Sequence, residues 1–175
     1  MRITTRHVVM IALFTALTVI GTMIKIPLPT GAFVHLGNAV LLLAVLFLGY
    51  FKGSLAGGLG FAIFDMLNGY AIEAPYFIVE SFIVGATAYG LFLLYHKKPT
   101  HIWQIIIIAT GTGVVKLIMT QIKNMVRQLY LGMDFPTAFT TAIFSLPATV
   151  VNVVLTAILV SFLYFPSKRA LATIL

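Results

Sequence analysis

Charged residues are scarce in this chain of 175 residues. Lys, Arg, Asp and Glu together make up 9% of it, whereas apolar residues make up 61% and the mean hydropathy is +1.08. A soluble domain of this composition could not cover its surface with polar side chains. The scarcity of charge excludes an ordinary water-soluble protein and predicts that most of the chain is embedded in lipid.

The sequence also lacks the motifs of common catalytic and metal sites. It has no cysteine, which excludes disulfides, thiol catalysis and thiolate metal ligands. Its four histidines form neither an H-E-x-x-H motif nor a pair four residues apart. No G-K-[ST] follows the glycines at 57, 58 and 60, so there is no phosphate loop. We therefore expect a protein that is not an enzyme, with no catalytic residue, metal or cofactor of its own.

Six long apolar runs are present, separated by short polar or proline-containing segments. A helix needs ~20 apolar residues to cross ~30 Å of hydrocarbon, and the backbone in lipid must be paired internally. The runs predict an all-α integral membrane protein, a six-transmembrane-helix bundle forming a single domain over residues 1–175. The approximate spans are 7–24, 33–50, 53–70, 75–95, 101–130 and 136–165.

The positions of Lys and Arg predict the orientation of the bundle. If the N-terminus is cytoplasmic, seven of these residues lie inside and three lie outside, which agrees with the positive-inside rule. Both termini are therefore predicted to be cytoplasmic. The net charge of +7 is mainly a topology signal, because no basic polar surface for nucleic acid is present. The inner residues are Arg2, Arg6, Lys52, Lys97, Lys98, Lys168 and Arg169, and the outer ones are Lys25, Lys123 and Arg127.

Polar side chains within the predicted spans share a similar depth. At ~1.5 Å per residue, Glu80 and Lys116 each lie ~8 Å below the outer boundary and could meet. Asn38, Asp65 and Asn152 lie ~6–10 Å below it. Apart from Gln104, close to the inner end of the fifth run, no acidic, basic or carboxamide side chain falls in the inner half of a span. Because polar groups in hydrocarbon usually face a cavity, this distribution predicts a ligand cavity open to the outside.

The fifth run carries a polar stripe that we interpret as one wall of this cavity. At 100° per residue, Thr112, Lys116, Thr120, Lys123 and Arg127 fall within an arc of roughly 80°. With the polar residues of similar depth and nearby aromatic side chains, the stripe predicts a site for a small polar ligand. The expected ligand-binding residues are Glu80, Lys116, Asn152, Asn38, Thr120, Lys123, Tyr76 and Phe33.

Structural roles are open alternatives for several of these residues. Basic side chains near the surface can snorkel to the interface, and a buried acid–base pair can be purely structural. A carboxamide can link two helices, and polar residues near a helix end can cap it or form a turn. The residues with such alternatives are Lys123, Arg127, Glu80, Lys116, Asn152, Asp65 and Asn68.

Small residues mark two helix faces where another helix can approach closely. The third run contains Gly53, Gly57 and Gly60, and the first contains Ala12 and Ala16, four residues apart. Internal packing explains most such patterns. A partner membrane subunit could also use the face that carries the two alanines.

These features resemble a known family along essentially the whole chain, most strongly from residue 33 to 90. The shared features are the A-x-x-x-A pair at Ala12 and Ala16, the proline-rich first outer loop, the run FVHLGNA at 33–39 and the run LGYFKGSLAGGLGFAIFDMLNGY at 48–70. The sequence resembles the S component of an energy-coupling factor (ECF) transporter. It is most similar to the branch assigned to riboflavin, hydroxymethylpyrimidine or vitamin B6.

The resemblance implies a vitamin-capturing, multi-pass subunit in a bacterial plasma membrane. In this family, loop one and the outer parts of helices four to six hold the vitamin. The alanine motif docks on a transmembrane T subunit, and two cytoplasmic ATPase subunits use ATP to drive uptake. By this resemblance Ala12 and Ala16 are docking residues, whereas Glu80, Lys116 and Asn152 lie on helices that line the site.

The substrate is open among several vitamins. A carboxylate at Glu80 suits the amino group of a protonated aminopyrimidine, so we expect hydroxymethylpyrimidine or a B6 vitamer. Riboflavin, folate and pantothenate are alternatives. The only tryptophan, Trp103, is expected at the inner interface. Stacking on the ligand would therefore fall to Phe33, Tyr76, Phe77 and Tyr130.

A different class of function is an independent small membrane protein, either a channel or an intramembrane enzyme. A channel should show polar residues through both leaflets, and an enzyme should show a nucleophile beside a base. The sequence shows neither pattern.

Overall fold

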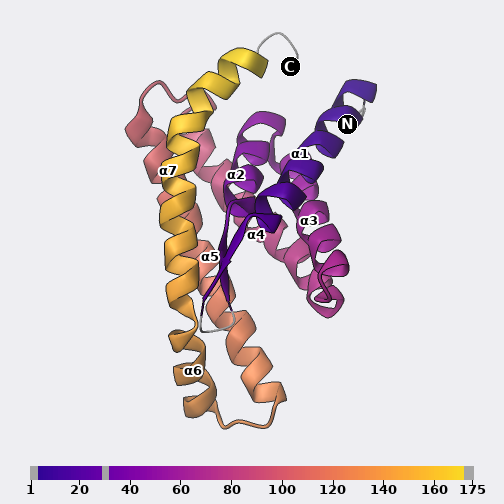
Figure 1. Cartoon of the computed structure of the whole chain (residues 1–175). Helices are drawn as coiled ribbons and strands as arrows, with labels where there is room; N and C mark the ends of the chain where they lie inside the picture. The colour runs from indigo at the N-terminus through magenta and orange to yellow at the C-terminus, as the bar shows by residue number, and fades with distance from the viewer. Residues whose placement is uncertain (1–3, 29–31, 172–175) are drawn as a thin grey trace.

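A computed structural model describes residues 4–28 and 32–171 of the chain, which form a helical bundle with a short β-hairpin (Figure 1). The helices are packed side by side, and the two ends of the described chain lie at the same end of the bundle. The elements are α1 (Thr5–Met23), β1 (Lys25–Pro27), β2 (Phe33–His35), α2 (Gly37–Leu48), α3 (Tyr50–Leu67), η1 (Ala71–Glu73), α4 (Ala74–Leu94), α5 (Ile102–Tyr130), α6 (Phe135–Phe144) and α7 (Leu146–Leu171).

Four helical segments of the described chain are long and apolar enough to cross a membrane: Thr5–Met23, Ala71–Leu94, Ile102–Tyr130 and Leu146–Leu171. Two shorter apolar helices, α2 and α6, accompany them. Their combination with α3 agrees with an all-α membrane bundle. The structure nevertheless differs from the six predicted segments in two places.

The first difference lies at the start of the second predicted span. Residues 33–35 form strand β2, which pairs antiparallel with β1 through Lys25↔His35, Ile26↔Val34 and Pro27↔Phe33. Helix α2 begins only at Gly37. The sequence is apolar through this segment, and an apolar run does not by itself distinguish a strand from a helix.

The second difference lies in the sixth predicted span, 136–165. The chain forms two helices there, because α6 ends at Phe144 and α7 begins at Leu146. Pro147, in the first turn of α7, has no N–H to continue the hydrogen bonds of α6, whereas proline is well tolerated at a helix start. The predicted span ends at 165, directly before Pro166, but Pro166 lies inside α7, which continues to Leu171.

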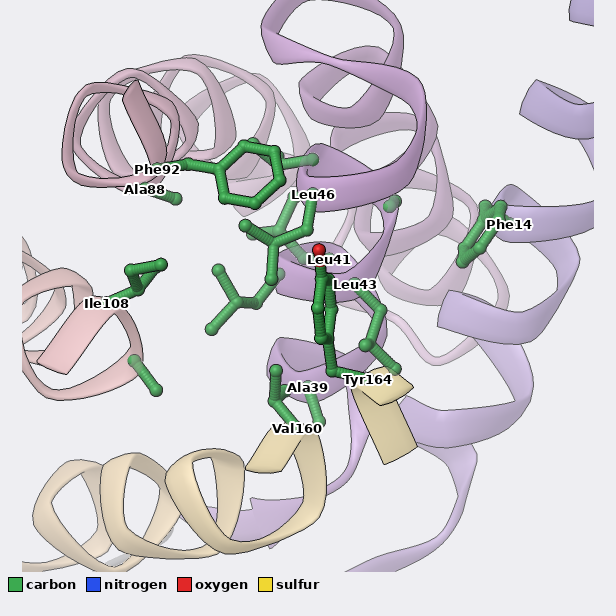
Figure 2. Close-up of a cluster of buried hydrophobic side chains, with 14 of the residues drawn as sticks. Phe14, Ala39, Leu41, Leu43, Leu46, Ala88, Phe92, Ile108, Val160 and Tyr164 are labelled. Atoms are coloured by element: carbon green, nitrogen blue, oxygen red, sulfur yellow. The ribbon is translucent and has the colours of Figure 1, made fainter. Parts of the chain in front are cut away.

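Helix α2 forms the centre of the apolar core. The residues from Leu41 to Leu46 are all buried, so α2 is apolar around its whole circumference. Figure 2 shows side chains of α1, α4, α5 and α7 converging on α2. The phenol ring of Tyr164 stacks on Phe47, with ring centroids 5.4 Å apart and an interplanar angle of 5°. This core occupies the end of the bundle away from the hairpin.

Glycines of α3 allow α1 and α2 to approach it closely. A Cβ atom on Gly53 would overlap the backbone of Val45 in α2. A Cβ atom on Gly60 would lie 2.5 Å from Cβ of Thr18 in α1. The glycines of the third predicted run therefore serve internal packing.

Gly53→Ala should destabilise the bundle, because the methyl group can be accommodated only if α2 and α3 move apart. We expect a loss of about 1–3 kcal/mol, the usual cost of overpacking, seen as a lower melting temperature of the detergent-solubilised protein. Gly90→Ala in α4 is the matched control, since a Cβ atom there meets nothing within 4 Å. The control should melt at the same or a higher temperature, because alanine favours helix over glycine. Equal melting of both variants would refute the close approach.

Candidate functional site

A cavity of about 500 Å³ lies at the hairpin end of the bundle. Its walls come from β2, the first turn of α2, the end of α3, η1, the start of α4, the second half of α5 and the start of α7. Helix direction places all these ends on one side, opposite the start of α1 and the end of α7 (Figure 1). The cavity thus lies at the face opposite the two termini.

All eight residues that the sequence predicted as ligand-binding line this cavity. It therefore brings together side chains from β2, α2, α4, α5 and α7. The eight are Phe33, Asn38, Tyr76, Glu80, Lys116, Thr120, Lys123 and Asn152. Their role toward a ligand stays a prediction.

Other lining residues were not predicted to bind a ligand. Some of them lie on the long helices and others on the short segments between them. The additions include His35, Tyr70, Glu73, Asn124, Gln128 and Ser145. The sequence did contain a signal for Glu73: this acid and the base Lys123 both lie near the predicted outer membrane boundary, so they could pair there.

Two residues of the original interpretation lie elsewhere. Tyr130, expected to offer a stacking surface, is 90% exposed at the end of α5 and does not line the cavity. Thr112, the deepest residue of the polar stripe, instead lines a smaller cavity of about 30 Å³. That cavity lies between α2, α4, α5 and α7 and shares Asn38 and Lys116 with the large one.

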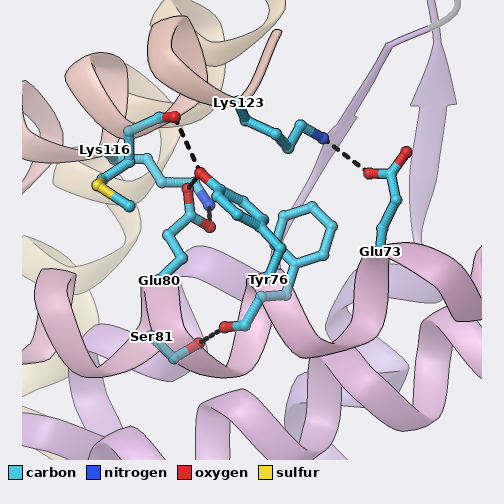
Figure 3. Close-up of polar contacts among 8 residues, drawn as sticks. Glu73, Tyr76, Glu80, Ser81, Lys116 and Lys123 are labelled. Carbon is cyan, nitrogen blue, oxygen red and sulfur yellow. Dashed lines mark hydrogen bonds and ion pairs between the residues drawn. The ribbon is translucent and has the colours of Figure 1, made fainter. Parts of the chain in front are cut away.

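An ion pair between Glu80 of α4 and Lys116 of α5 lies on the cavity wall (Figure 3). Glu80 is 2% exposed, so its carboxylate depends on protein partners. The Tyr76 hydroxyl lies 2.9 Å from Glu80 Oε1 and 2.9 Å from the Met119 carbonyl oxygen, which share its single proton. The meeting of Glu80 and Lys116 that the depth argument predicted is confirmed.

A second ion pair joins η1, which directly precedes α4, to α5 nearer the end of the bundle. Lys123 Nζ lies 2.8 Å from Glu73 Oε2. The Phe77 ring lies between the two ammonium groups, 5.3 Å from Lys116 Nζ and 4.9 Å from Lys123 Nζ. Both distances suit cation–π attraction. Four charges are thus held in two pairs around one aromatic ring, and this arrangement leaves little net charge on this wall.

Asn152 attaches the hairpin to α7. Its Oδ1 accepts a hydrogen bond from the His35 N–H at 2.8 Å, and its Nδ2 donates to the Phe33 carbonyl at 3.0 Å. In the antiparallel pair, Ile26 faces Val34, so Phe33 and His35 present these groups on the other edge of β2. The carboxamide therefore pairs with β2 as a neighbouring strand would.

The His35 ring adds a defined donor to the cavity. The Gly37 N–H donates to His35 Nδ1 at 3.2 Å, which requires an unprotonated Nδ1. The neutral ring then carries its proton on Nε2. This residue lines the cavity without having been predicted from the sequence.

Lys25 of β1 holds the other side of the hairpin. Its Nζ lies 5.1 Å from the Phe33 ring centroid and 4.9 Å from that of Phe64, and it donates to Asn68 Oδ1 at 3.3 Å. Asn68 Nδ2 in turn donates to the Phe64 carbonyl at 2.9 Å, at the end of α3. Asn68 therefore caps the end of α3, which is the structural role considered for it from the sequence.

These features define a class of protein: a helical membrane protein with a polar and aromatic cavity for a small molecule near one face. The family model described as ECF-type riboflavin transporter, S component, matches residues 2–169. The chain belongs to this family, as the resemblance predicted, and is a vitamin-uptake subunit of the ECF type. Members of the family are substrate-binding subunits rather than enzymes. Neither the curated proteins nor the solved structures gave a match.

Asn152→Ala should loosen the hairpin, because it removes both bonds to β2. We expect faster hydrogen exchange of the His35 amide and faster dissociation of bound ligand. Asn152→Asp should have an intermediate effect, since it keeps the acceptor for the His35 N–H but loses the donor to Phe33. Thr156→Val, about one turn further along α7, is the control and should leave both rates unchanged. Unaltered exchange at His35 in the alanine variant would show that the hairpin does not depend on this residue.

Proposed function

We propose that the chain captures riboflavin from outside the cell and delivers it to an ATP-driven ECF uptake complex. The observation that carries this proposal is the cavity, about 500 Å³ in volume and lined by six aromatic rings together with polar side chains. Such a volume falls in the ~300–1,000 Å³ range of sites for ligands of several rings. The matching family model is itself described by riboflavin. The aromatic lining residues are Phe33, Phe61, Phe64, Tyr70, Tyr76 and Phe77.

The electrostatics of the wall favour a neutral ligand. Lys116 and Lys123 are already paired with Glu80 and Glu73 within the protein. A cationic ligand that took the Glu80 carboxylate would leave the largely buried Lys116 without its partner, at a cost of up to ~3–5 kcal/mol. Riboflavin carries no net charge at neutral pH, so it can stack on the aromatic rings while both ion pairs stay closed.

Hydroxymethylpyrimidine or a B6 vitamer is the second candidate. It was the substrate expected from the sequence, and the Glu80 carboxylate with Tyr76 beside it offers acceptors for its amino or hydroxyl group. A single six-membered ring would fill only a part of the cavity, however. This candidate therefore ranks below riboflavin.

Titration of the detergent-solubilised protein separates the two candidates. We expect riboflavin to bind with sub-micromolar affinity, on the order of −8 kcal/mol or better, and its fluorescence to be quenched by the aromatic lining. Hydroxymethylpyrimidine and pyridoxine, followed by calorimetry, should bind at least about a hundredfold more weakly because they contact less of the cavity. Tight binding of either small vitamin without binding of riboflavin would reverse the ranking.

The proposed partners are a transmembrane T subunit and two cytoplasmic ATPase subunits, which supply the energy from ATP. Ala12 and Ala16 are both exposed on α1, whereas Phe14, Thr15 and Thr18 of the same helix are buried. The alanine face is therefore free for a helix of the T subunit. Because neither side chain extends beyond Cβ, a partner helix can approach α1 closely there.

Replacing both Ala12 and Ala16 by Leu should abolish uptake while ligand binding by the isolated subunit persists. The larger side chains keep the partner helix at a distance but do not reach the cavity. Uptake of labelled riboflavin into cells that hold the T and ATPase subunits is the measurement. Ala86→Leu, an exposed alanine of α4, is the matched control and should transport normally. Normal uptake by the double variant would show that the two alanines have no role in docking.

A further inference from the structure

One acidic side chain in the cavity has a buried oxygen with no hydrogen-bond partner among the described residues. The chain contains four acidic residues. Glu80 pairs with Lys116, Glu73 pairs with Lys123, and Asp134 accepts a hydrogen bond from the Thr137 N–H at the start of α6. Asp65 differs from these three. It is 4% exposed and lines the cavity, and its Oδ2 is buried without a hydrogen-bond partner among the described residues.

The local structure gives this carboxylate no stabilising role. Asp65 lies in the last turn of α3, where the negative end of the helix dipole disfavours an anion. The helix end is capped by the Asn68 side chain and by the Tyr70 N–H, which donates to the backbone carbonyl of Asp65 at 2.8 Å. The capping function considered for the Asp65 side chain from the sequence is therefore already performed by other groups.

We propose that Asp65 is a specificity-determining acceptor that takes a hydrogen bond from a ring N–H of the bound vitamin. The inference rests on the proposed function. An unpaired acceptor buried in a cavity is costly while the cavity is empty, and a ligand donor removes that cost on binding. The neighbouring aromatic residues Phe61 and Phe64 also line the cavity, so a planar ring can lie against them with its edge toward the carboxylate.

The chemistry of riboflavin defines the donor. The isoalloxazine ring of the oxidised vitamin has a single N–H, at N3, between two carbonyl groups. The flanking carbonyls make it a strong donor, and its bond to a carboxylate is charge-assisted. A bound cation is a less suitable occupant, because no group of three or more His, Cys, Asp or Glu side chains in the described ranges could hold a metal ion. The recognised chemistry is therefore an imide N–H.

A thermodynamic cycle between protein and ligand tests this assignment. Riboflavin and 3-methylriboflavin are titrated into the wild-type protein and into Asp65→Leu, which resembles aspartate in shape but has no acceptor. We expect the substitution to weaken riboflavin binding about ten- to a hundredfold, as for a lost charged hydrogen bond. Methylation of N3 should weaken binding to the wild type by a similar factor. For 3-methylriboflavin, the substitution should then cause little further loss, because the bond is already gone.

Melting of the ligand-free protein gives a second readout that a structural role would not produce. Asp65→Leu removes a buried, unpaired acceptor, so its melting temperature should equal or exceed that of the wild type. Asp65→Asn keeps a neutral acceptor and should bind riboflavin with intermediate affinity. Asp134→Asn, which changes an exposed acid outside the cavity, is the control and should bind both ligands as the wild type does.

The outcomes separate the site from the proposed function. If the wild-type protein binds no riboflavin, the proposed function fails, and this assignment fails with it. If riboflavin binds but Asp65→Leu weakens both ligands by the same factor, or neither, the vitamin is confirmed and the role of Asp65 is overturned. A lower melting temperature of ligand-free Asp65→Leu would also overturn it, since the carboxylate would then be structural. If Asp65→Leu does not fold, two other measurements test the bond: binding of riboflavin to Asp65→Asn and binding of 3-methylriboflavin to the wild type. If both affinities equal that of riboflavin for the wild type, the bond is refuted.

Discussion

Hydrocarbon offers no hydrogen bonds, so a polar group within the bundle needs a partner in the protein or a place in a cavity. The ion pair of Glu80 and Lys116 meets this requirement, with Tyr76 as an additional donor. A single buried charge would cost several kcal/mol, and this cost forces the acid and the base to face one another. The segments that carry them, α4 and α5, are thereby brought into register. The cavity lies where these obligatory polar contacts concentrate.

The shape of the cavity depends on the short helix α2. Twelve residues extend for ~18 Å, well below the ~30 Å of a hydrocarbon core. The chain before α2 therefore folds into the bundle as the β-hairpin. The hairpin is held by directional bonds, from Asn152 of α7 and from the Leu36 N–H to the Gly21 carbonyl at 2.8 Å.

The packed core around α2 and the cavity at the hairpin end thus differ in structure. The end that contains α2 is tightly packed, with glycines of α3 in close contact with α1 and α2, and it supplies stability. The hairpin end exposes aromatic rings and charges to the cavity in which we propose that the vitamin is recognised. Two of the three acids at the cavity are paired with lysines, whereas Oδ2 of Asp65 has no hydrogen-bond partner among the described residues. Stability and specificity are therefore assigned to separate sets of residues.

The sequence alone was sufficient for the membrane class, the helical bundle, the family and eight of the residues around the cavity. These depend on local properties, namely hydropathy, charge and the depth of a residue along its helix. Depth predicted that Glu80 and Lys116 could meet, because a helix has a constant rise per residue. The depth estimate could not predict that Glu73 pairs with Lys123, because Glu73 belongs to the short helix η1, for which the sequence predicts no helix along which depth could be counted.

Only the tertiary structure decided the remaining features. It showed that residues 33–35 form a strand, that the chain breaks between α6 and α7, and that Asn152 binds the edge of β2. It also showed which polar atoms are satisfied, and so distinguished Asp65 from the other acids. Such facts depend on contacts between residues as far apart in sequence as Phe33 and Asn152. An apolar run reports only that a segment avoids water, whereas pairing depends on which segments the packed bundle brings within hydrogen-bond distance.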